Sequence, residues 1–427
     1  MKALFGIIMC SLLHFCWSFS IASIPVSLRR YNQPKKFVPL CYRTKACSPR
    51  RYDSYMTIMS ELNPSLEKNY HQNPFEFVKT VWDFSRPHTV IGSFLSIVSL
   101  FAFATPRALW FSKKFLYATL YSLLPSILVN IYITGLNQVT DVDIDKINKP
   151  YLPIASGKLS LTSGIAIVIG TLFTSLVISW HAAWPLKMAL YGSTVLGTLY
   201  SLPPFRLKRF PMLAALCILV VRGSIINLGF FFQAKMSVMQ QHIPSLLSGV
   251  QTCPESLVVT SFFAIFGLVI AIMKDVPDVK GDLKFNIRSF SVRVGAKRMF
   301  EVAWRTLLAL LSSSALGIFL SLFLPFFSSV SPSVSSTNLL LQPTVSSSSS
   351  TSICSICSYI SSLISLHSCS VWISRLFSFV MLSVFAWDVQ DRAKKIEVED
   401  TSSVFDFYMY IWKIFYACYL LLPLATL

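Results

Sequence analysis

Apolar stretches of about 20 residues recur along this chain from residue 89 to its end. They lie near 89–106, 115–136, 160–180, 185–203, 211–233, 256–273, 306–327, 371–388 and 404–426. An apolar helix of roughly 20 residues is long enough to cross the hydrocarbon core of a bilayer. The pattern therefore predicts an all-α polytopic membrane protein with about nine transmembrane helices.

Composition supports this prediction. Hydrophobic residues make up 54% of the chain and charged residues only 13%, whereas a soluble domain carries about 25% charged residues. The first 60 residues hold nine Lys and Arg and a single acid, Asp53. This is typical of an organellar transit peptide, although the apolar start of the chain also resembles a secretory signal peptide. We expect a targeting or disordered segment over 1–75 and one intramembrane domain over 76–427.

A serine-rich segment interrupts the apolar pattern at about 328–369. Residues 306–374 contain no Lys, Arg, Asp or Glu, and the segment includes the run Ser346–Ser350. Such a composition indicates a low-complexity linker. We expect an inserted loop without a catalytic role, with a tenth membrane span as the alternative.

The formal net charge is +18, which could indicate a nucleic-acid partner. However, Lys and Arg concentrate in the N-terminal 60 residues and in the loops after the second, fourth, sixth and eighth apolar stretches. This alternation is the positive-inside bias of membrane proteins. We therefore expect contact with membrane lipid and no nucleic-acid partner.

Acidic residues are scarce, 19 of 427, yet six of them lie in two short windows. The first window runs from Asn137 to Asp145 and the second from Lys274 to Asp282. Both follow even-numbered apolar stretches, so both lie on the same side of the membrane. Carboxylates beside apolar segments are costly unless they are paired, bound to metal or hydrated. We therefore expect the two windows to face each other.

Within each window, helical spacing places polar residues on one face. The two sets are Asn137, Asp141 and Asp145, spaced i, i+4, i+8, and Asp275, Asp278 and Asp282, spaced i, i+3, i+7. Asp143 points elsewhere on this pattern, and Pro277 marks a helix end or a kink. Clustered oxygen ligands suit Mg²⁺ that is shared with substrate phosphates. Zinc fits less well, because neither window contains His or Cys.

Residues near both windows are candidates for binding the oxygens of a diphosphate. They are Arg86, Lys149, Lys158, Tyr200, Lys208 and Arg209. For Lys208 and Arg209 an alternative remains open, because a basic pair after a membrane span also serves topology.

At this point the motifs resemble those of the UbiA superfamily of intramembrane aromatic prenyltransferases. The two windows match paired NQxxDxxxD and KDxxDxxGD motifs. The flanking motifs are Arg86-Pro-His-Thr89, Asn148-Lys-Pro-Tyr-Leu-Pro-Ile-Ala-Ser-Gly157 and Tyr200-Ser-Leu-Pro-Pro204. These flanks are similar to the plant homogentisate phytyltransferase branch, which also contains flavonoid, coumarin and phloroglucinol prenyltransferases.

The resemblance implies nine helices around a central cavity. It also implies that Asn137, Asp141, Asp145, Asp275, Asp278 and Asp282 hold Mg²⁺ and diphosphate, with no organic cofactor. The expected reaction transfers a prenyl group from a prenyl diphosphate to a phenolic acceptor, in a plastid membrane or alternatively in the endoplasmic reticulum. We favour a coumarin, flavonoid or related phenol as acceptor, with homogentisate as the alternative.

A function of another class is an ion-coupled membrane transporter with buried acids. A transporter predicts acids near the centres of membrane spans, whereas the acids here follow the ends of the spans. The donor chain length, the position of prenylation and the oligomeric state stay open at this point.

Overall fold

The computed structural model describes residues 74–285, 287, 289–328 and 350–425, and their regular secondary structure is helical. The long helical segments are α5 (Pro87–Ala104), α6 (Lys113–Thr140), α8 (Leu161–Ser179), α9 (Trp184–Ser201), α10 (Pro211–Ile218) continued by the π-helix η4 (Leu219–Ile225) and α11 (Ile226–Ser237), α13 (Glu255–Asp275), α16 (Ala296–Ser328), α17 (Ser350–Ala393) and α18 (Thr401–Ala425). The short ones are α4 (Pro74–Phe84), η2 (Arg107–Leu109), α7 (Val142–Asn148), η3 (Leu207–Arg209), α12 (Leu246–Thr252), α14 (Val279–Lys284) and α15 (Phe290–Val294).

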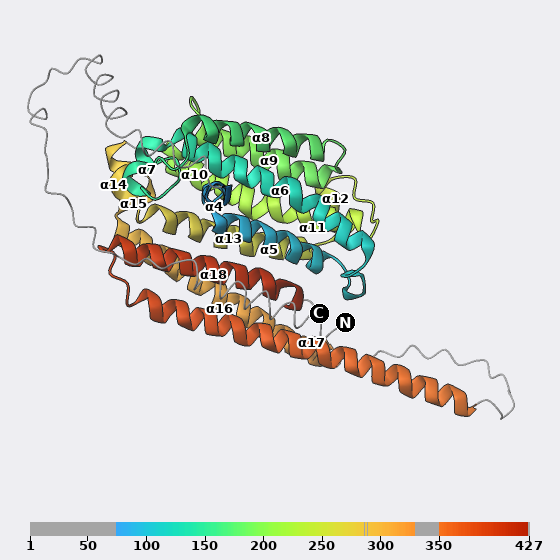
Figure 1. Cartoon of the computed structure of the whole chain (residues 1–427). Coiled ribbons are helices and arrows are strands. Elements are labelled where there is room, and N and C mark those ends of the chain that lie inside the picture. The colour runs from blue at the N-terminus through green and yellow to red at the C-terminus, as the bar shows by residue number, and fades with distance from the viewer. Residues whose placement is uncertain (1–73, 286, 288, 329–349, 426–427) are drawn as a thin grey trace, which may run out of the picture. The chain divides into compact units, whose positions relative to one another are not determined.

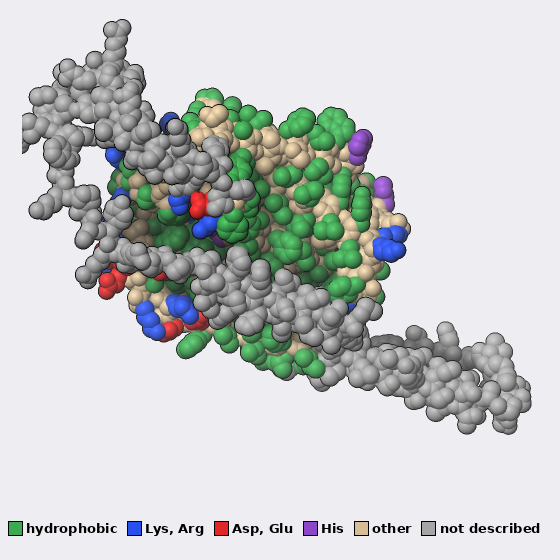
Figure 2. Space-filling view, in the orientation of Figure 1, with side chains coloured by type: hydrophobic (Ala, Val, Ile, Leu, Met, Phe, Trp, Pro, Cys, Tyr) green, Lys and Arg blue, Asp and Glu red, His purple; other side chains and the backbone are tan. Residues whose placement is uncertain are grey.

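The long helices match the nine apolar stretches. Among the described residues, eight helical segments are long and apolar enough to cross a membrane, and α9 lies where the stretch 185–203 predicted the remaining one. Hydrophobic side chains cover most of the visible face of the molecule, and charged side chains gather toward its ends (Figure 2). The prediction of an all-α polytopic membrane protein is confirmed.

Local sequence signals set several helix starts. The Ser112 hydroxyl accepts a hydrogen bond from the Phe115 amide at 3.1 Å at the start of α6. Ser160 caps α8 in the same way. Serine at this position satisfies an amide that has no partner within the helix. Pro87 lies in the first turn of α5, where the missing amide of proline costs nothing.

Six helical segments surround a central cavity, and the others lie outside it. Residues of α5, α6, α9, α10 to α11, α13 and α18 line the cavity. Outside this ring, α8 packs on α6 and α16 packs on α13 and α17 (Figure 1). The ring of Phe263 on α13 stacks on Tyr419 of α18, with centroids 3.6 Å apart. The fold thus leaves a cavity inside this ring of helices, and part of its lining comes from the acidic windows.

The structure differs from the predicted loop at 328–369, because α17 already begins at Ser350. Residues 350–369 contain neither Gly nor Pro, the residues least favourable in a helix, so this part can extend the helix that follows. The rest of the loop, 329–349, lies outside the described residues. So does the predicted targeting segment up to residue 73.

Candidate active site

Two short helices, α7 and α14, bring the acidic windows together at one end of the bundle (Figure 1). α6 ends at Asp141, whose φ of −116° and ψ of 17° interrupt the helix before α7 begins. α13 ends before Pro277, as predicted, and Asp278 directly precedes α14. The Gly281 amide donates a hydrogen bond to Asn148 Oδ1 at 2.9 Å, which ties α14 to α7. The windows therefore meet, although each lies across a helix break instead of on one continuous helix.

A small polar pocket of about 50 Å³ lies between the windows. Its lining includes all six residues predicted to hold the metal and diphosphate, Asn137, Asp141, Asp145, Asp275, Asp278 and Asp282, and also Lys149, Tyr200 and Lys208. Four carboxylates are buried, with exposed fractions of 7% for Asp141, 5% for Asp145, 6% for Asp278 and 7% for Asp282. Asp143 points away, as predicted, with 77% of its side chain exposed.

Basic side chains that follow α7 and α9 pair with two of the buried carboxylates, Asp278 and Asp141. Lys149 pairs with Asp278 across the two windows. Asp141 accepts from Lys208 and from Arg206, whose Nη2 lies 2.8 Å from Asp141 Oδ1. These cations are held where a phosphate group could replace the carboxylate as their partner.

Two arginines reach the site from a strained backbone. Arg86 has φ of 54° and Arg206 has φ of 40°, which is the left-handed region that costs about 1–2 kcal/mol for a residue with a side chain. Arg86 Nη2 donates to Asn137 Oδ1 at 3.3 Å, and Arg206 binds Asp141. Strain of this kind concentrates at functional sites, where it positions groups.

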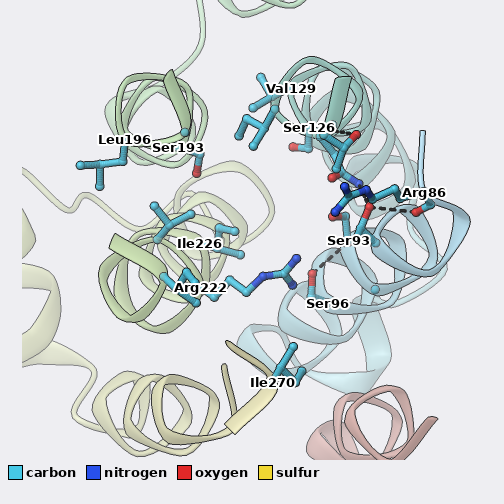
Figure 3. Close-up of a pocket in the computed structure, with 18 of the residues that line it drawn as sticks. Arg86, Ser93, Ser96, Ser126, Val129, Ser193, Leu196, Arg222, Ile226 and Ile270 are labelled. Carbon is cyan, nitrogen blue, oxygen red and sulfur yellow. Dashed lines mark hydrogen bonds between the residues drawn. The ribbon is translucent and has the colours of Figure 1, made fainter. Parts of the chain in front are cut away.

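A larger cavity of about 250 Å³ lies beside the polar pocket. Asn137, Tyr200 and Lys274 line both spaces, so a molecule bound in the polar pocket can extend into the cavity. The cavity walls combine apolar residues such as Leu196 and Ile270 with several serines and arginines (Figure 3). An apolar chain can thus lie behind a polar, charged head.

The structure separates the predicted diphosphate-binding residues into two groups. Lys149, Tyr200 and Lys208 line the polar pocket, and Arg86 reaches it through Asn137. Lys158 and Arg209 have exposed side chains and line neither space.

Sequence reasoning missed three polar residues of the site. Arg206 binds Asp141, Asn148 accepts from Gly281, and Lys274 lines both spaces, with its Nζ 5.9 Å from the centroid of Tyr200. Asn148 and Lys274 belong to the motifs quoted above, so the sequence already contained a signal that they lie at the site. The role of Arg206 depends on its backbone conformation, which the sequence does not reveal.

The residues present fit a divalent cation that is shared with a phosphate group. Asp145 Oδ2 is buried and has no hydrogen-bond partner, so it is available as a ligand. The donors are oxygens, the ligands that Mg²⁺ prefers. Within the part of the chain that the structure describes, no three carboxylate, His or Cys groups form a ready-made metal site. Carboxylates of both windows line the same pocket, which suits a cation shared between a few carboxylates and phosphate oxygens.

The pocket carboxylates resist ionisation, which predicts a pH-dependent requirement for Mg²⁺. Burial raises the pKa of Asp145 to about 6, against the opposing effect of Arg86. Burial also raises the pKa of Asp282 to about 7, reinforced by Asp278. Because a protonated carboxyl is a poor ligand, we expect the Mg²⁺ concentration for half-maximal activity to rise roughly five- to tenfold between pH 7.5 and pH 6.

Assays at fixed ionic strength measure this, and the range stops at pH 7.5 because burial lowers the pKa of Lys208 to about 8. Asp282→Asn is the control, since it should flatten the dependence. A Mg²⁺ requirement that is constant over this range in the unmodified protein would contradict the prediction.

Gly281 makes the contact between the windows possible. A Cβ at this position would lie 2.3 Å from Asn148 Oδ1, closer than atoms approach. Gly281→Ala therefore displaces Asn148, and we expect kcat/KM to fall about tenfold, as for a small misplacement of reacting groups. Gly170→Ala is the matched control, because a Cβ there meets nothing within 4 Å. Equal activity of the two variants would show that the contact is dispensable.

Comparisons with known proteins find relatives over most of this chain. The model of the UbiA prenyltransferase family matches residues 93–342. The chain is 36% identical to homogentisate phytyltransferase 1, chloroplastic, of Arabidopsis thaliana, over 84% of this chain and 78% of that one. It is 29% identical to glycinol 4-dimethylallyltransferase of Glycine max, over 85% and 76% of the two chains.

A solved structure of a UbiA homolog from Archaeoglobus fulgidus bound to GPP and Mg²⁺ is also similar to this chain. It is 14% identical with a TM-score of 0.47, and the match covers 81% of this chain and 99% of that one. The family match covers more than half of this chain, and the plant relative aligns over most of its length. This chain therefore belongs to the UbiA prenyltransferase family, in its branch of aromatic prenyltransferases.

Proposed function

We propose that this protein transfers a prenyl group from a prenyl diphosphate to a phenolic ring and releases diphosphate, with Mg²⁺ as the metal. The observation that carries the proposal is the pairing of Lys149 with Asp278, which joins the two acidic windows beside an apolar cavity. Charged groups bind the diphosphate head, and the cavity receives the apolar tail. One site thus suits both ends of an amphiphilic donor.

Each side chain has a distinct task in this proposal. Asp141, Asp145, Asp278 and Asp282 hold the cation together with diphosphate oxygens, and Mg²⁺ supplies Lewis acidity toward the leaving group. Lys149 and Lys208 turn from their carboxylates to phosphate oxygens. Arg86 orients Asn137 through its hydrogen bond, which fixes the edge of the site nearest the cavity.

The reaction then breaks the C–O bond of the donor and a C–H bond of the ring, and it forms one C–C bond. The C–O bond to the diphosphate breaks and the leaving group keeps the electron pair, so positive charge develops on the allylic carbon. An electron-rich ring carbon of the phenol attacks it, and transfer of the ring proton to the released diphosphate restores aromaticity. The apolar walls exclude water, which would otherwise capture the cation.

For the acceptor, the comparisons favour homogentisate. Relatives named for homogentisate share 34–37% identity with the chain, and the flavonoid-type relative, a glycinol dimethylallyltransferase, shares 29%. We therefore place homogentisate ahead of the coumarin or flavonoid that the sequence alone favoured. Both acceptors are phenols, so the donor chemistry is the same.

We propose a plastid membrane as the location. The relatives from Arabidopsis thaliana and rice are named chloroplastic, and the exposed apolar residues of α8 and α17 suit contact with lipid. Residues 76–427 then form the catalytic domain and residues 1–75 a targeting segment. The endoplasmic reticulum has no support from these relatives.

An assay of membranes that contain the full-length protein tests the function. Dimethylallyl, geranyl, geranylgeranyl and phytyl diphosphates are each combined with homogentisate, a coumarin, a flavonoid and a phloroglucinol, with and without Mg²⁺. The proposal expects a prenylated product that depends on Mg²⁺. Absence of product from every pair, with the protein inserted, would favour the transporter instead.

A further inference from the structure

Arg222 is a charged residue of the larger cavity to which the donor chemistry gives no role. It lies in η4, near the middle of the membrane-crossing segment Pro211–Ser237. A charge at such a depth is costly, and it normally faces a partner or a hydrated cavity. The side chain extends from its helix into the cavity toward α5, where Ser93 and Ser96 lie (Figure 3).

The guanidinium group of Arg222 has no anionic partner. Among the residues that the structure describes, it forms no ion pair and donates no hydrogen bond, and its side-chain contact is with the face of Trp412, 5.0 Å from Cζ to the ring centroid. Arg206, by contrast, binds Asp141. Removing a charge from water without a partner is strongly unfavourable, so this site is complete only with an anion.

A second polar group in the same cavity also lacks a partner. Ser193 on α9 is 5% exposed, its Oγ makes no hydrogen bond, and it lines the cavity (Figure 3). A buried hydroxyl without a partner is destabilising, because it has lost its hydrogen bonds to water. Ser193 and Arg222 thus offer a hydroxyl and a cation to one bound molecule.

We propose that Arg222 determines acceptor specificity by binding a carboxylate on a single-ring phenol, with Ser193 hydrogen-bonded to a phenolic hydroxyl. The proposal rests on the prenyl transfer proposed above. The planar guanidinium matches a carboxylate with two parallel hydrogen bonds, and Trp412 holds it in place by a cation–π contact. A prenyl tail at this position would leave the charge unpaired.

The size of the cavity points the same way. Its volume of about 250 Å³ is below the roughly 300–1,000 Å³ of most small-molecule pockets. In the proposed function the same cavity also receives the prenyl chain, so the space left for the acceptor suits a single ring with a short acidic substituent better than the fused rings of a flavonoid.

Equilibrium binding to the purified full-length protein tests the proposal, with homogentisate and its uncharged methyl ester as probes. Wild-type protein should bind the acid at least about 30-fold more tightly than the ester, as expected for a buried charge pair. Arg222→Met should reduce this ratio to within about threefold, mainly by weakening binding of the acid, and Arg222→Lys should retain part of it. Arg305→Met, which removes an exposed arginine on α16, should leave the ratio unchanged.

Binding of geranylgeranyl diphosphate with Mg²⁺ is measured on the same samples and separates the two proposals. If wild-type protein binds the donor but prefers neither probe, or if Arg222→Met binds the donor and keeps the preference, the role of Arg222 is overturned and the prenyl transfer stands. If wild-type protein binds no donor and yields no product, the proposed function fails. If Arg222→Met alone loses donor binding, the comparison uses wild-type protein and Arg222→Lys. A wild-type preference for the acid of at least about 30-fold that falls in Arg222→Lys supports the role of Arg222, and any other result overturns it.

Discussion

Asp145→Asn is expected to lower kcat/KM by at least about a thousandfold and yet to make the ligand-free protein more stable. Asp145 lines the polar pocket, is 5% exposed, and its Oδ2 has no hydrogen-bond partner. In the proposed function this oxygen is free to hold the cation. An asparagine of the same shape carries no charge, so it would bind the cation weakly, and the leaving group would lose the charge stabilisation that the cation supplies.

The stability gain follows from the raised pKa. Burial raises the pKa of Asp145 from 3.8 to about 6 in the folded chain, so ionisation disfavours folding as the pH rises through this range. At pH 7.5 without metal the penalty reaches about 3 kcal/mol. Removing it should raise Tm in EDTA by roughly 2–4 °C. At about pH 3 the difference should become small, because this pH lies below both pKa values and the wild-type carboxyl is then largely neutral in both states.

Asp143→Asn is the matched control, two residues away. Its side chain is 77% exposed and pairs with Lys146 at the surface, so neither kcat/KM nor Tm should change appreciably. Thermal unfolding in detergent and a Mg²⁺-dependent assay give both values. Activity of Asp145→Asn within tenfold of wild type would remove Asp145 from the site.

The lengths of the apolar stretches were sufficient to predict the fold, but they did not predict where every helix begins and ends. The nine apolar stretches coincide with nine long helical segments, because a run of about 20 apolar residues is stable as a helix that crosses the hydrocarbon core of a membrane. Serine content misled at Ser350, where α17 already begins. The serine content of a segment indicates a loop only on average. A stable helix can extend into a neighbouring segment that contains no helix-breaking residue.

The spacing of the acids identified the two windows, but not the shape of the backbone. The assumption of one continuous helix failed at Asp141, and the residues nevertheless met because α7 continues almost at once. Arg206 could not be predicted, since its contact with Asp141 depends on φ of 40°. Arg222 was visible as a lone charge within the stretch 211–233, and the membrane cost of that charge was the signal.

Lys149→Met is expected to lower kcat/KM about a hundredfold, chiefly by raising KM for the prenyl diphosphate. Lys149 joins the windows through Asp278 and lines the polar pocket. A phosphate oxygen that enters the pocket can take the place of this carboxylate, and a buried charge-assisted bond of this kind contributes roughly 2–5 kcal/mol. Lys208→Met should behave similarly, because Lys208 is in the equivalent position at Asp141.

Lys158→Met and Arg209→Met are the matched controls. They also test whether the diphosphate-binding residues are those predicted from the sequence or only those that line the pocket. The sequence placed all four basic residues at the diphosphate, but Lys158 and Arg209 are exposed and line neither space. We expect these two variants to stay within about threefold of wild type, as for exposed charges in high dielectric. Steady-state assays over a range of donor concentrations measure each KM. A loss in Lys158→Met equal to that in Lys149→Met would mean that the loop after α7 moves over the bound diphosphate, and the sequence-based set would then be correct.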